Sequence, residues 1–131
     1  MTLENDDNIE MFFMPNPQSG KYCHLVFNVG GTKLDLLPIP GPGGAPVNYL
    51  RWNPDWQVKI KIDANRGWSA EVFLPWAVFS GEQFKELSSP ADAGAQWRAF
   101  VGRSRRQMEY SGLVWVESFH NIKRYPTLKF E

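Results

Sequence analysis

The sequence is poor in the residues that build disulfides and metal sites. It contains one cysteine, Cys23, and two histidines, His24 and His120, among 131 residues. A single cysteine excludes an internal disulfide, and His120 lies far along the chain from the other two residues, which disfavours a zinc site. Cys23 stands in the apolar run YCHLVFN, where we expect a free cysteine to behave as a small buried hydrophobe.

The chain also lacks an excess of charge and any long apolar run. Lysine and arginine together number 14, aspartate and glutamate also number 14, and the net charge is zero. There is therefore no global field to attract DNA or an anionic membrane. No apolar run is long enough to span a membrane, and the acidic start MTLENDDN has no signal-peptide pattern. We expect a cytosolic protein or one whose leader and preceding segment lie outside this sequence.

Motifs of catalysis and nucleotide binding are missing as well. The glycines of PIPGPGG stand among prolines and precede no helix start, so they form no phosphate-cradling loop. There is no GxSxG elbow, and no spacing singles out a catalytic pair of carboxylates. The glutamates considered are Glu10, Glu71, Glu109 and Glu117. Arg103, Arg105 and Arg106 form a small basic cluster, which at zero net charge indicates a solvated strand end rather than a nucleic-acid site. The sequence therefore predicts that the protein is not an enzyme.

What the sequence does contain is alternation of polar and apolar residues between turn signals, which predicts about eight strands and almost no helix. The expected strands are 9–14, 21–29, 32–37, 57–63, 68–74, 97–106, 112–116 and 126–131. Residues 38–47, PIPGPGGAPV, are predicted to form a long surface loop, and residues 76–89 a short helix or two turns. We expect residues 1–131 to form a single all-β domain, an antiparallel β-sandwich.

The stretch RGWSAEVFLPW, residues 66–76, places a charge inside a strand pattern. One face of this strand carries Trp68, Ala70, Val72 and Leu74, and the other carries Ser69, Glu71 and Phe73. A lone glutamate on a strand is most often solvated. We nevertheless expect a structural role for Glu71, in which it accepts hydrogen bonds from loop N–H groups or pairs with an arginine such as Arg98 or Arg103.

Aromatic residues make up 15% of the chain and include six tryptophans. Aromatics fill the cores of small β-proteins, but beside Arg, Glu, His and Asn they also suit carbohydrate. The C–H faces of a sugar stack on aromatic rings, and its hydroxyls need charge-assisted hydrogen bonds. The tryptophans at strand edges or inner faces are expected in the core: Trp68, Trp76 and Trp97. Those that flank loops are open to either role: Trp52, Trp56 and Trp115.

Five blocks cover nearly the whole chain, in this order: NDDNIEMFFMPNP, KYCHLVFNVGGTKLD, RGWSAEVFLPWAVF, AQWRAFVGRSRR and VWVESFHNIKRYPTLKF. Together they resemble the family 9 carbohydrate-binding modules and their uncharacterised bacterial relatives, of the DOMON-like kind. The most specific block is GW-x-x-E-x-x-x-PW. The resemblance implies an immunoglobulin-like or jelly-roll sandwich that binds a saccharide without catalysis. It also implies an extracellular or periplasmic location, an adjoining glycoside-degrading domain and, in some members, structural calcium.

The resemblance further implies a sugar site. By block position, the acidic residue of the site falls at Glu10, and a stacking aromatic falls near Phe119, next to His120. A family arginine falls near Val26, so Arg103 is expected to serve instead. The other stacking aromatic is expected where this chain has Leu3 and Glu4. Either this aromatic wall of the sugar site is absent, or another residue such as Trp52 or Trp56 supplies it. The candidate carbohydrate-binding residues are Glu10, Trp52, Arg103, Trp115, Phe119 and His120.

Two departures from the family pattern keep other functions open: the aromatic that is missing at Leu3 and Glu4, and the early start of the chain. Family members carry several strands before the acidic block, whereas this chain starts almost at that block, which predicts a truncated N-terminus and an exposed sheet edge covered by a second chain. The main alternative is therefore a structural or docking β-sandwich with no sugar site. A hydrolase with a pair of catalytic carboxylates is a less favoured alternative, because no spacing singles out such a pair. A related sandwich family binds haem, for which the candidate ligands are Met11, Met14, His24 and Met108.

Overall fold

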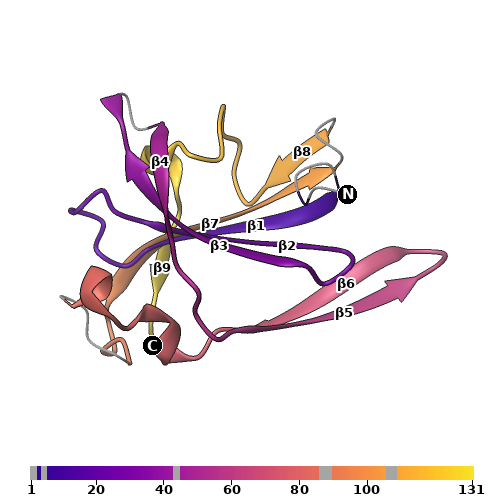
Figure 1. Ribbon diagram of the computed structural model, residues 1–131, viewed down its shortest axis with the longest axis horizontal. Coiled ribbons are helices and arrows are strands. Elements are labelled where there is room, and N and C mark those ends of the chain that lie inside the picture. The colour runs from indigo at the N-terminus through magenta and orange to yellow at the C-terminus, as the bar shows by residue number, and fades with distance from the viewer. Residues whose placement is uncertain (1–2, 4–5, 43–44, 86–89, 106–108) are drawn as a thin grey trace.

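The computed structural model describes residues 3, 6–42, 45–85, 90–105 and 109–131 (Figure 1). These residues form nine β-strands and no α-helix, which confirms the predicted all-β class. The strands are β1 (Asp7–Met14), β2 (Cys23–Asn28), β3 (Lys33–Pro40), β4 (Pro46–Arg51), β5 (Gln57–Asp63), β6 (Gly67–Phe73), β7 (Gln96–Arg105), β8 (Glu109–Gly112) and β9 (Thr127–Lys129). No helix in these ranges has the length and apolar character needed to cross a membrane.

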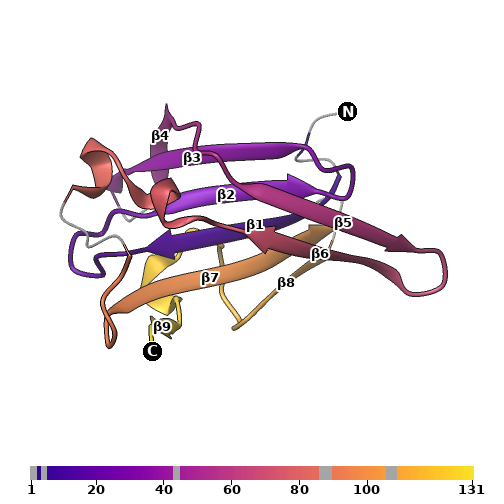
Figure 2. The same ribbon diagram turned by 90° about the horizontal axis from the view of Figure 1, so that it is seen from below.

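The strands form two antiparallel sheets of unequal size. The main sheet has seven strands in the order β4-β3-β2-β1-β7-β8, with β9 also paired to β7. The second sheet contains only β5 and β6, and we call this hairpin the arm. The arm lies over one face of the main sheet, so that the two sheets form the layers of a β-sandwich (Figure 2).

Period-two alternation sends the side chains of the central strands to both faces of the main sheet. In β1, Met11 belongs to the core on one face and Phe12 to the core on the other. Strand β2 is buried along its whole length, since it pairs with β1 on one side and β3 on the other. Burial on both faces explains why this strand reads as a nearly continuous apolar run in the sequence.

The first core lies between the main sheet and the layer formed by the arm, η3 (Trp76–Phe79) and η4 (Glu82–Phe84), two short 3-10 helices. Its buried residues are Met11, Cys23, Leu25, Phe27, Trp56, Val78, Phe79, Phe84 and Trp97. Cys23 and Trp97 are buried as predicted, whereas Trp76 is 38% exposed. Trp56, whose role the sequence left open, is a core residue whose indole N–H donates to Asp35 at 2.6 Å.

The second core lies on the opposite face, beneath residues 116–125, which include the 3-10 helix η5 (Ile122–Arg124). Its buried residues are Phe12, Met14, Tyr22, Phe100 and Tyr125. The Tyr125 hydroxyl donates to the carbonyl oxygen of Phe119 at 2.7 Å. This bond ties the covering segment to the core that it covers.

The predicted strand 112–116 does not form beyond its first residue, Gly112, which is the last residue of β8. The partner of β7 is β8, which ends at Gly112, and the following Leu113 N–H makes one more bond to the Val101 carbonyl at 3.0 Å. Beyond that point the same edge of β7 is taken by the C-terminal segment, because the Ala99 N–H donates to Pro126 at 2.9 Å. The apolar residues after Gly112 therefore have no free strand edge to join in the described part of the chain, and Trp115 is 71% exposed.

The proline-rich segment 38–47 contains less loop than predicted, since β3 continues to Pro40 and β4 begins at Pro46. Strand β2 pairs with β3 only as far as Leu36. Pro38 and Pro40 therefore lie where β3 has a neighbour on one side only, and their missing N–H groups leave no gap in a ladder.

Candidate functional site

A cavity of about 460 Å³ opens on the face of the main sheet that carries the second core. Its described lining comes from six strands and two flanking segments: Leu3, Asn8, Glu10, His24, Val26, Leu34, Leu36, Tyr49, Ser104, Tyr110 and His120. We call it the polar cavity. Antiparallel register explains its composition, because Asn8 pairs with Ser104 and Glu10 with Val26, and paired residues face the same side.

A carboxylate–imidazole pair forms the floor of the polar cavity. His24 Nε2 lies 2.8 Å from Glu10 Oε2, with side chains that are 7% and 20% exposed. Because a carboxylate only accepts, the imidazole donates through Nε2–H. The His24 ring also stacks on Phe12, its cross-strand neighbour, at 4.1 Å between ring centroids. Glu10 is thereby held in one orientation, while its Oε1 atom has no partner among the described residues.

His120 forms a second polar group on the wall of the cavity. Its Nδ1 atom shares a hydrogen bond of 2.7 Å with the Tyr22 hydroxyl, which leaves Nε2 without a partner in the described part of the chain. Burial, reinforced by the nearby His24, lowers the pKa of His120 to about 4. The ring is therefore neutral at physiological pH, and its free nitrogen is suited to a hydroxyl rather than to an anion.

Two buried polar atoms at the Glu10–His24 pair and at the neighbouring Asn8 have no hydrogen-bond partner within the described residues. They are Asn8 Oδ1 and His24 Nδ1. The amide nitrogen of Asn8, by contrast, donates to the carbonyl oxygens of Leu3 and Asp6 at 3.3 Å. Leaving a buried acceptor unpaired costs free energy. Such atoms are common where a protein keeps hydrogen-bonding capacity for a ligand or water.

Aromatic side chains stand at the rim of the polar cavity. Tyr110 is 60% exposed and lies edge-on to Phe119 at 5.8 Å between centroids. Phe119 fits there because Gly102 has no side chain, since a Cβ at this position would lie 2.6 Å from the Phe119 ring. The glycine in β7 thus determines how closely the covering segment approaches the sheet.

The structure brings together some of the predicted carbohydrate-binding residues. Glu10 and His120 line the polar cavity, and Phe119 contacts the ring of Tyr110, which also lines it. Leu3, where the family resemblance called for an aromatic, also lines the cavity, while Glu4 lies outside the described residues.

The other predicted site residues lie elsewhere. Trp52 packs against Phe84 in the first core, and Trp115 is largely exposed beyond the end of β8. Arg103 is on the arm face of the main sheet, where its Nε atom donates to Asp7 Oδ1 at 2.8 Å. The predicted structural role of Glu71, with Arg98, Arg103 or loop N–H groups as partners, is therefore wrong. Glu71 is exposed opposite Lys59 and has no hydrogen bond or ion pair with the described residues.

Sequence reasoning missed Tyr22, Tyr49 and Tyr110, and it did not assign His24 to the sugar site. A signal for two of these existed, because Tyr22, His24 and Val26 alternate on one face of YCHLVFN. Tyr49 and Tyr110 could not be placed in this way, since β4 and β8 were not recognised as strands.

The described residues give little support to metal or haem binding. They contain no group of three His, Cys, Asp or Glu side chains that could hold a metal ion, and so offer no side-chain cluster for a structural calcium. Of the proposed haem ligands, Met11 and Met14 belong to different cores, and Met108 lies outside the described residues.

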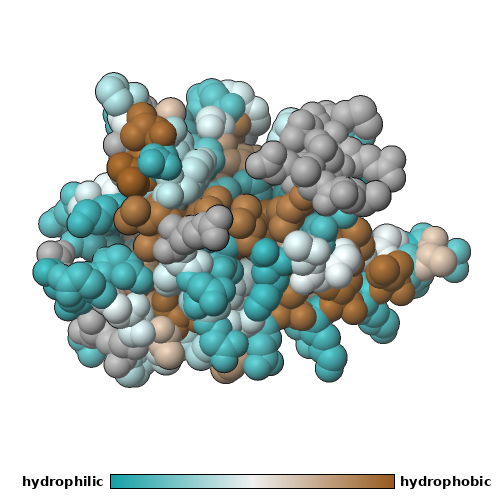
Figure 3. Space-filling view, viewed as in Figure 1, coloured by the Kyte–Doolittle hydropathy of each residue, from teal (hydrophilic) through white to brown (hydrophobic). Residues whose placement is uncertain are grey.

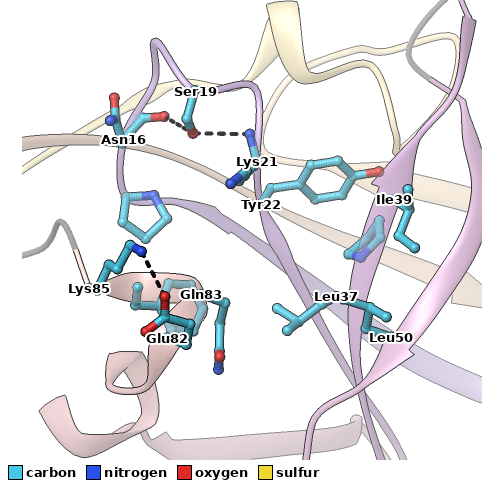
Figure 4. A pocket seen from close by; sticks show the side chains of 13 residues that line it. Asn16, Ser19, Lys21, Tyr22, Leu37, Ile39, Leu50, Glu82, Gln83 and Lys85 are labelled. Carbon is cyan, nitrogen blue, oxygen red and sulfur yellow. Dashed lines mark hydrogen bonds and ion pairs between the residues drawn. The ribbon is translucent and has the colours of Figure 1, made fainter.

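A second, less polar cavity of about 270 Å³ lies at the other end of β2 (Figure 4). Its floor is apolar, with Leu37, Leu50 and Phe84, and Lys85 on its rim is paired with Glu82 at 2.6 Å. We call it the apolar cavity. The ring of Tyr22 lines this cavity while its hydroxyl binds His120 of the polar cavity.

No protein-family model, curated protein or solved structure matches the chain. The resemblance to family 9 carbohydrate-binding modules therefore remains a prediction. The functional interpretation depends on the geometry of the polar cavity.

Proposed function

We propose that the polar cavity binds a saccharide without transforming it. The observation that carries this proposal is the Glu10–His24 pair, in which one carboxylate oxygen is fixed by an imidazole and the other is left for a ligand. Charge-assisted hydrogen bonds from sugar hydroxyls to such an oxygen are stronger than neutral ones.

The rest of the lining suits the amphipathic surface of a sugar. Leu34, Leu36 and Val26 offer apolar contact for C–H groups, and Tyr110 offers an exposed ring at the rim. His120 Nε2 and Asn8 Oδ1 add two further hydrogen-bonding groups that have no partner among the described residues. The volume of about 460 Å³ lies within the range typical of small-ligand sites, roughly 300–1,000 Å³.

The number of carboxylates in the polar cavity favours binding without catalysis. Glu10 is the sole carboxylate among the described residues that line the cavity. Hydrolysis of a glycosidic bond by the usual mechanism needs two carboxyl groups that flank the bond. A single carboxylate held by a histidine can orient hydroxyls but cannot supply both roles.

Calorimetric titration with a panel of mono- and oligosaccharides tests this function. We expect saturable heat with at least one sugar, no release of reducing ends, and an affinity about tenfold or more weaker in Glu10→Gln. Glu109→Gln is the matched control, because this glutamate neighbours Tyr110 but pairs with Arg105 outside the cavity. Unchanged affinity in Glu10→Gln, or no binding by the folded protein, would contradict the proposal.

The alternative function, a docking module, is favoured by one separate observation. The arm is the whole described second sheet of the sandwich, and among the described residues it pairs with no strand outside itself. A docking module would give no heat with any sugar but would associate through this layer. The two functions involve opposite faces of the main sheet and can be tested independently.

A further inference from the structure

Tyr22 connects the two cavities. Its ring lines the apolar cavity, whereas its hydroxyl shares the 2.7 Å hydrogen bond with Nδ1 of His120, a residue that lines the polar cavity. The ring belongs to the second core and packs against Phe12 at 6.1 Å and Tyr125 at 6.3 Å between centroids. Any influence of the Tyr22 hydroxyl on the polar cavity therefore passes through His120.

The length of the Tyr22–His120 bond does not say which side chain donates, because a phenol and a neutral imidazole can each donate or accept. The surroundings of the Tyr22 hydroxyl decide it, since this group has no other partner among the described residues. The apolar cavity beside its ring has an apolar floor with Leu37 and Leu50. Figure 3 shows apolar surface over β4, the strand that carries Leu50.

If the Tyr22 hydroxyl accepted from His120, its own hydrogen would have no acceptor in the described part of the chain. A buried donor without a partner costs free energy. Donation from Tyr22 to Nδ1 of His120 leaves neither group unsatisfied, so this direction is the favourable one.

Both side chains have the protonation state that this direction needs. Burial, reinforced by Tyr49, raises the pKa of Tyr22 well above its ordinary value, so the phenol keeps its hydrogen at physiological pH. His120 is neutral there, because burial lowers its pKa to about 4. A neutral imidazole carries one hydrogen, and with Nδ1 accepting from Tyr22 that hydrogen lies on Nε2.

We infer that Tyr22 is a positioning residue of the saccharide site: it donates to Nδ1 of His120, so that Nε2–H of His120 donates to the ligand, and the site selects neutral saccharides over acidic ones. This inference rests on the proposed saccharide function and names the class of sugar that the same site takes.

Packing holds the ring that carries this donor. His120 lies edge-on to Phe12 at 5.3 Å and to His24 at 5.4 Å between ring centroids. These contacts restrict the plane of the imidazole, but they do not determine which of its nitrogens carries the hydrogen. The hydrogen bond from Tyr22 supplies that choice.

The polar cavity then presents one group that only donates and one that only accepts. Nε2–H of His120 donates, and the free carboxylate oxygen of Glu10 accepts. Neighbouring sugar hydroxyls satisfy both, because each hydroxyl can donate and accept. A carboxylate on the ligand accepts from His120 but cannot donate to Glu10, and the like charges repel each other.

No cation offsets that repulsion among the described residues that line the polar cavity. Ser104 of β7 faces the cavity, so alternation places Arg103 and Arg105 on the opposite face of the sheet. These two arginines pair with Asp7 and Glu109. The electrostatics of the cavity therefore disfavour an acidic sugar.

Nitrogen NMR of the unaltered protein tests the direction of the bond without any ligand. At neutral pH we expect the ring shifts of His120 to show a hydrogen on Nε2 and none on Nδ1. His24 is an internal reference for this tautomer, since its Nε2–H donates to Glu10. A hydrogen on Nδ1 of His120 would overturn the inference, whether or not any saccharide binds.

Tyr22→Phe keeps the ring and removes only the hydroxyl. In calorimetric titration with a sugar that binds, we expect this variant to bind roughly three- to tenfold more weakly, as for the loss of one hydrogen bond. The nitrogen shifts of His120 should move to values between those of the two tautomers. Unchanged affinity in Tyr22→Phe would overturn the positioning role.

Tyr125→Phe is the matched control, because it removes another buried hydroxyl from the second core. The partner of that hydroxyl is the carbonyl oxygen of Phe119 rather than His120. We expect the nitrogen shifts of His120 to stay unchanged and the sugar affinity to be close to that of the unaltered protein. Equal losses of affinity in the two variants would show a general effect of the core and overturn the inference.

A neutral sugar and its uronic acid test the selectivity in the unaltered protein, so this result stands even where a variant fails to fold. We expect the acid to bind roughly tenfold or more weakly than the neutral parent. Equal or tighter binding of the acid would overturn the selectivity and leave the proposed function standing. No binding by any sugar would contradict the proposed function and the ligand role of His120 together, while the nitrogen shifts would still decide the direction of the Tyr22–His120 bond.

Discussion

The two faces of β1 carry two acidic residues with different surroundings. Asp7 faces the arm, where it accepts hydrogen bonds from Arg103 and from the Trp68 indole N–H. Glu10 faces the polar cavity, where it accepts one bond from His24 and keeps a free oxygen. A carboxylate whose partners are all within the protein stabilises the fold, whereas one with spare capacity beside a cavity is available to a ligand.

The largest change in stability should come from a substitution in the second core, on the face of the main sheet that carries the polar cavity. Gly102→Ala would place a Cβ 2.6 Å from Phe119 and 2.9 Å from Phe100. We expect the covering segment to shift and the free energy of unfolding to fall by about 1–3 kcal/mol, the usual cost of overpacking. Urea unfolding measures this. Gly30→Ala is the control, because its Cβ would meet only Asn28 at 3.4 Å. Equal free energies of unfolding for the two variants would refute the packing role of Gly102.

Asp7→Asn should lower stability without altering sugar affinity. The hydrogen bonds from Arg103 are the main reason that the pKa of Asp7 is lowered from 3.8. The carboxylate therefore contributes stability that is present above pH 3.8 and is lost as pH falls through the lower folded-state pKa. At neutral pH we expect a loss of about 1 kcal/mol, a modest value because Arg103 is 43% exposed. A fall in sugar affinity at unchanged stability would break the proposed division between the faces.

His120 should make stability depend on pH in a different window. Burial lowers the pKa of His120 from 6.5 to about 4, so the unfolded chain takes up this proton first as pH falls. The stabilising contribution is complete above pH 6.5 and declines down to about pH 4. We expect a change on the order of 1 kcal/mol, discounted for partial solvation, that disappears in His120→Gln. A pH profile of unfolding that is the same in both proteins would contradict this.

The smallest change in stability should come from a substitution of Glu71. Its side chain is exposed and has no hydrogen bond or ion pair with other described residues. Glu71→Gln should therefore change the free energy of unfolding by less than about 0.5 kcal/mol, as is usual for surface positions. Thermal unfolding measures this, and a loss well above that value would revive a structural role for this glutamate.

Sequence periodicity predicted the central part of the fold because burial there is decided by local alternation. The β5–β6 hairpin was found from Val58, Ile60 and Ile62, and β1 and β2 from apolar residues on two faces. The peripheral strands were harder, since β8 depends on which part of the β7 edge is free. That is a tertiary property that the run GLVWV does not encode.

The candidate site was predicted in part. Family resemblance indicated Glu10 and His120, and the structure places both at one cavity. Arg103 could not be assigned correctly from the sequence, because the face of β7 on which it lies is fixed by its register with Ile9. Tyr110 reaches the rim only through β8, so no local pattern marks it.

The most direct test of the central claim is an NMR titration that follows side-chain signals on both faces at once. With a saccharide that binds, we predict saturable shifts in the imidazole signals of His24 and His120, while the indole N–H signal of Trp68 beside Asp7 stays in place. Shifts confined to Trp68, or unchanged histidine signals with every sugar tested on the folded protein, would contradict a saccharide site at Glu10.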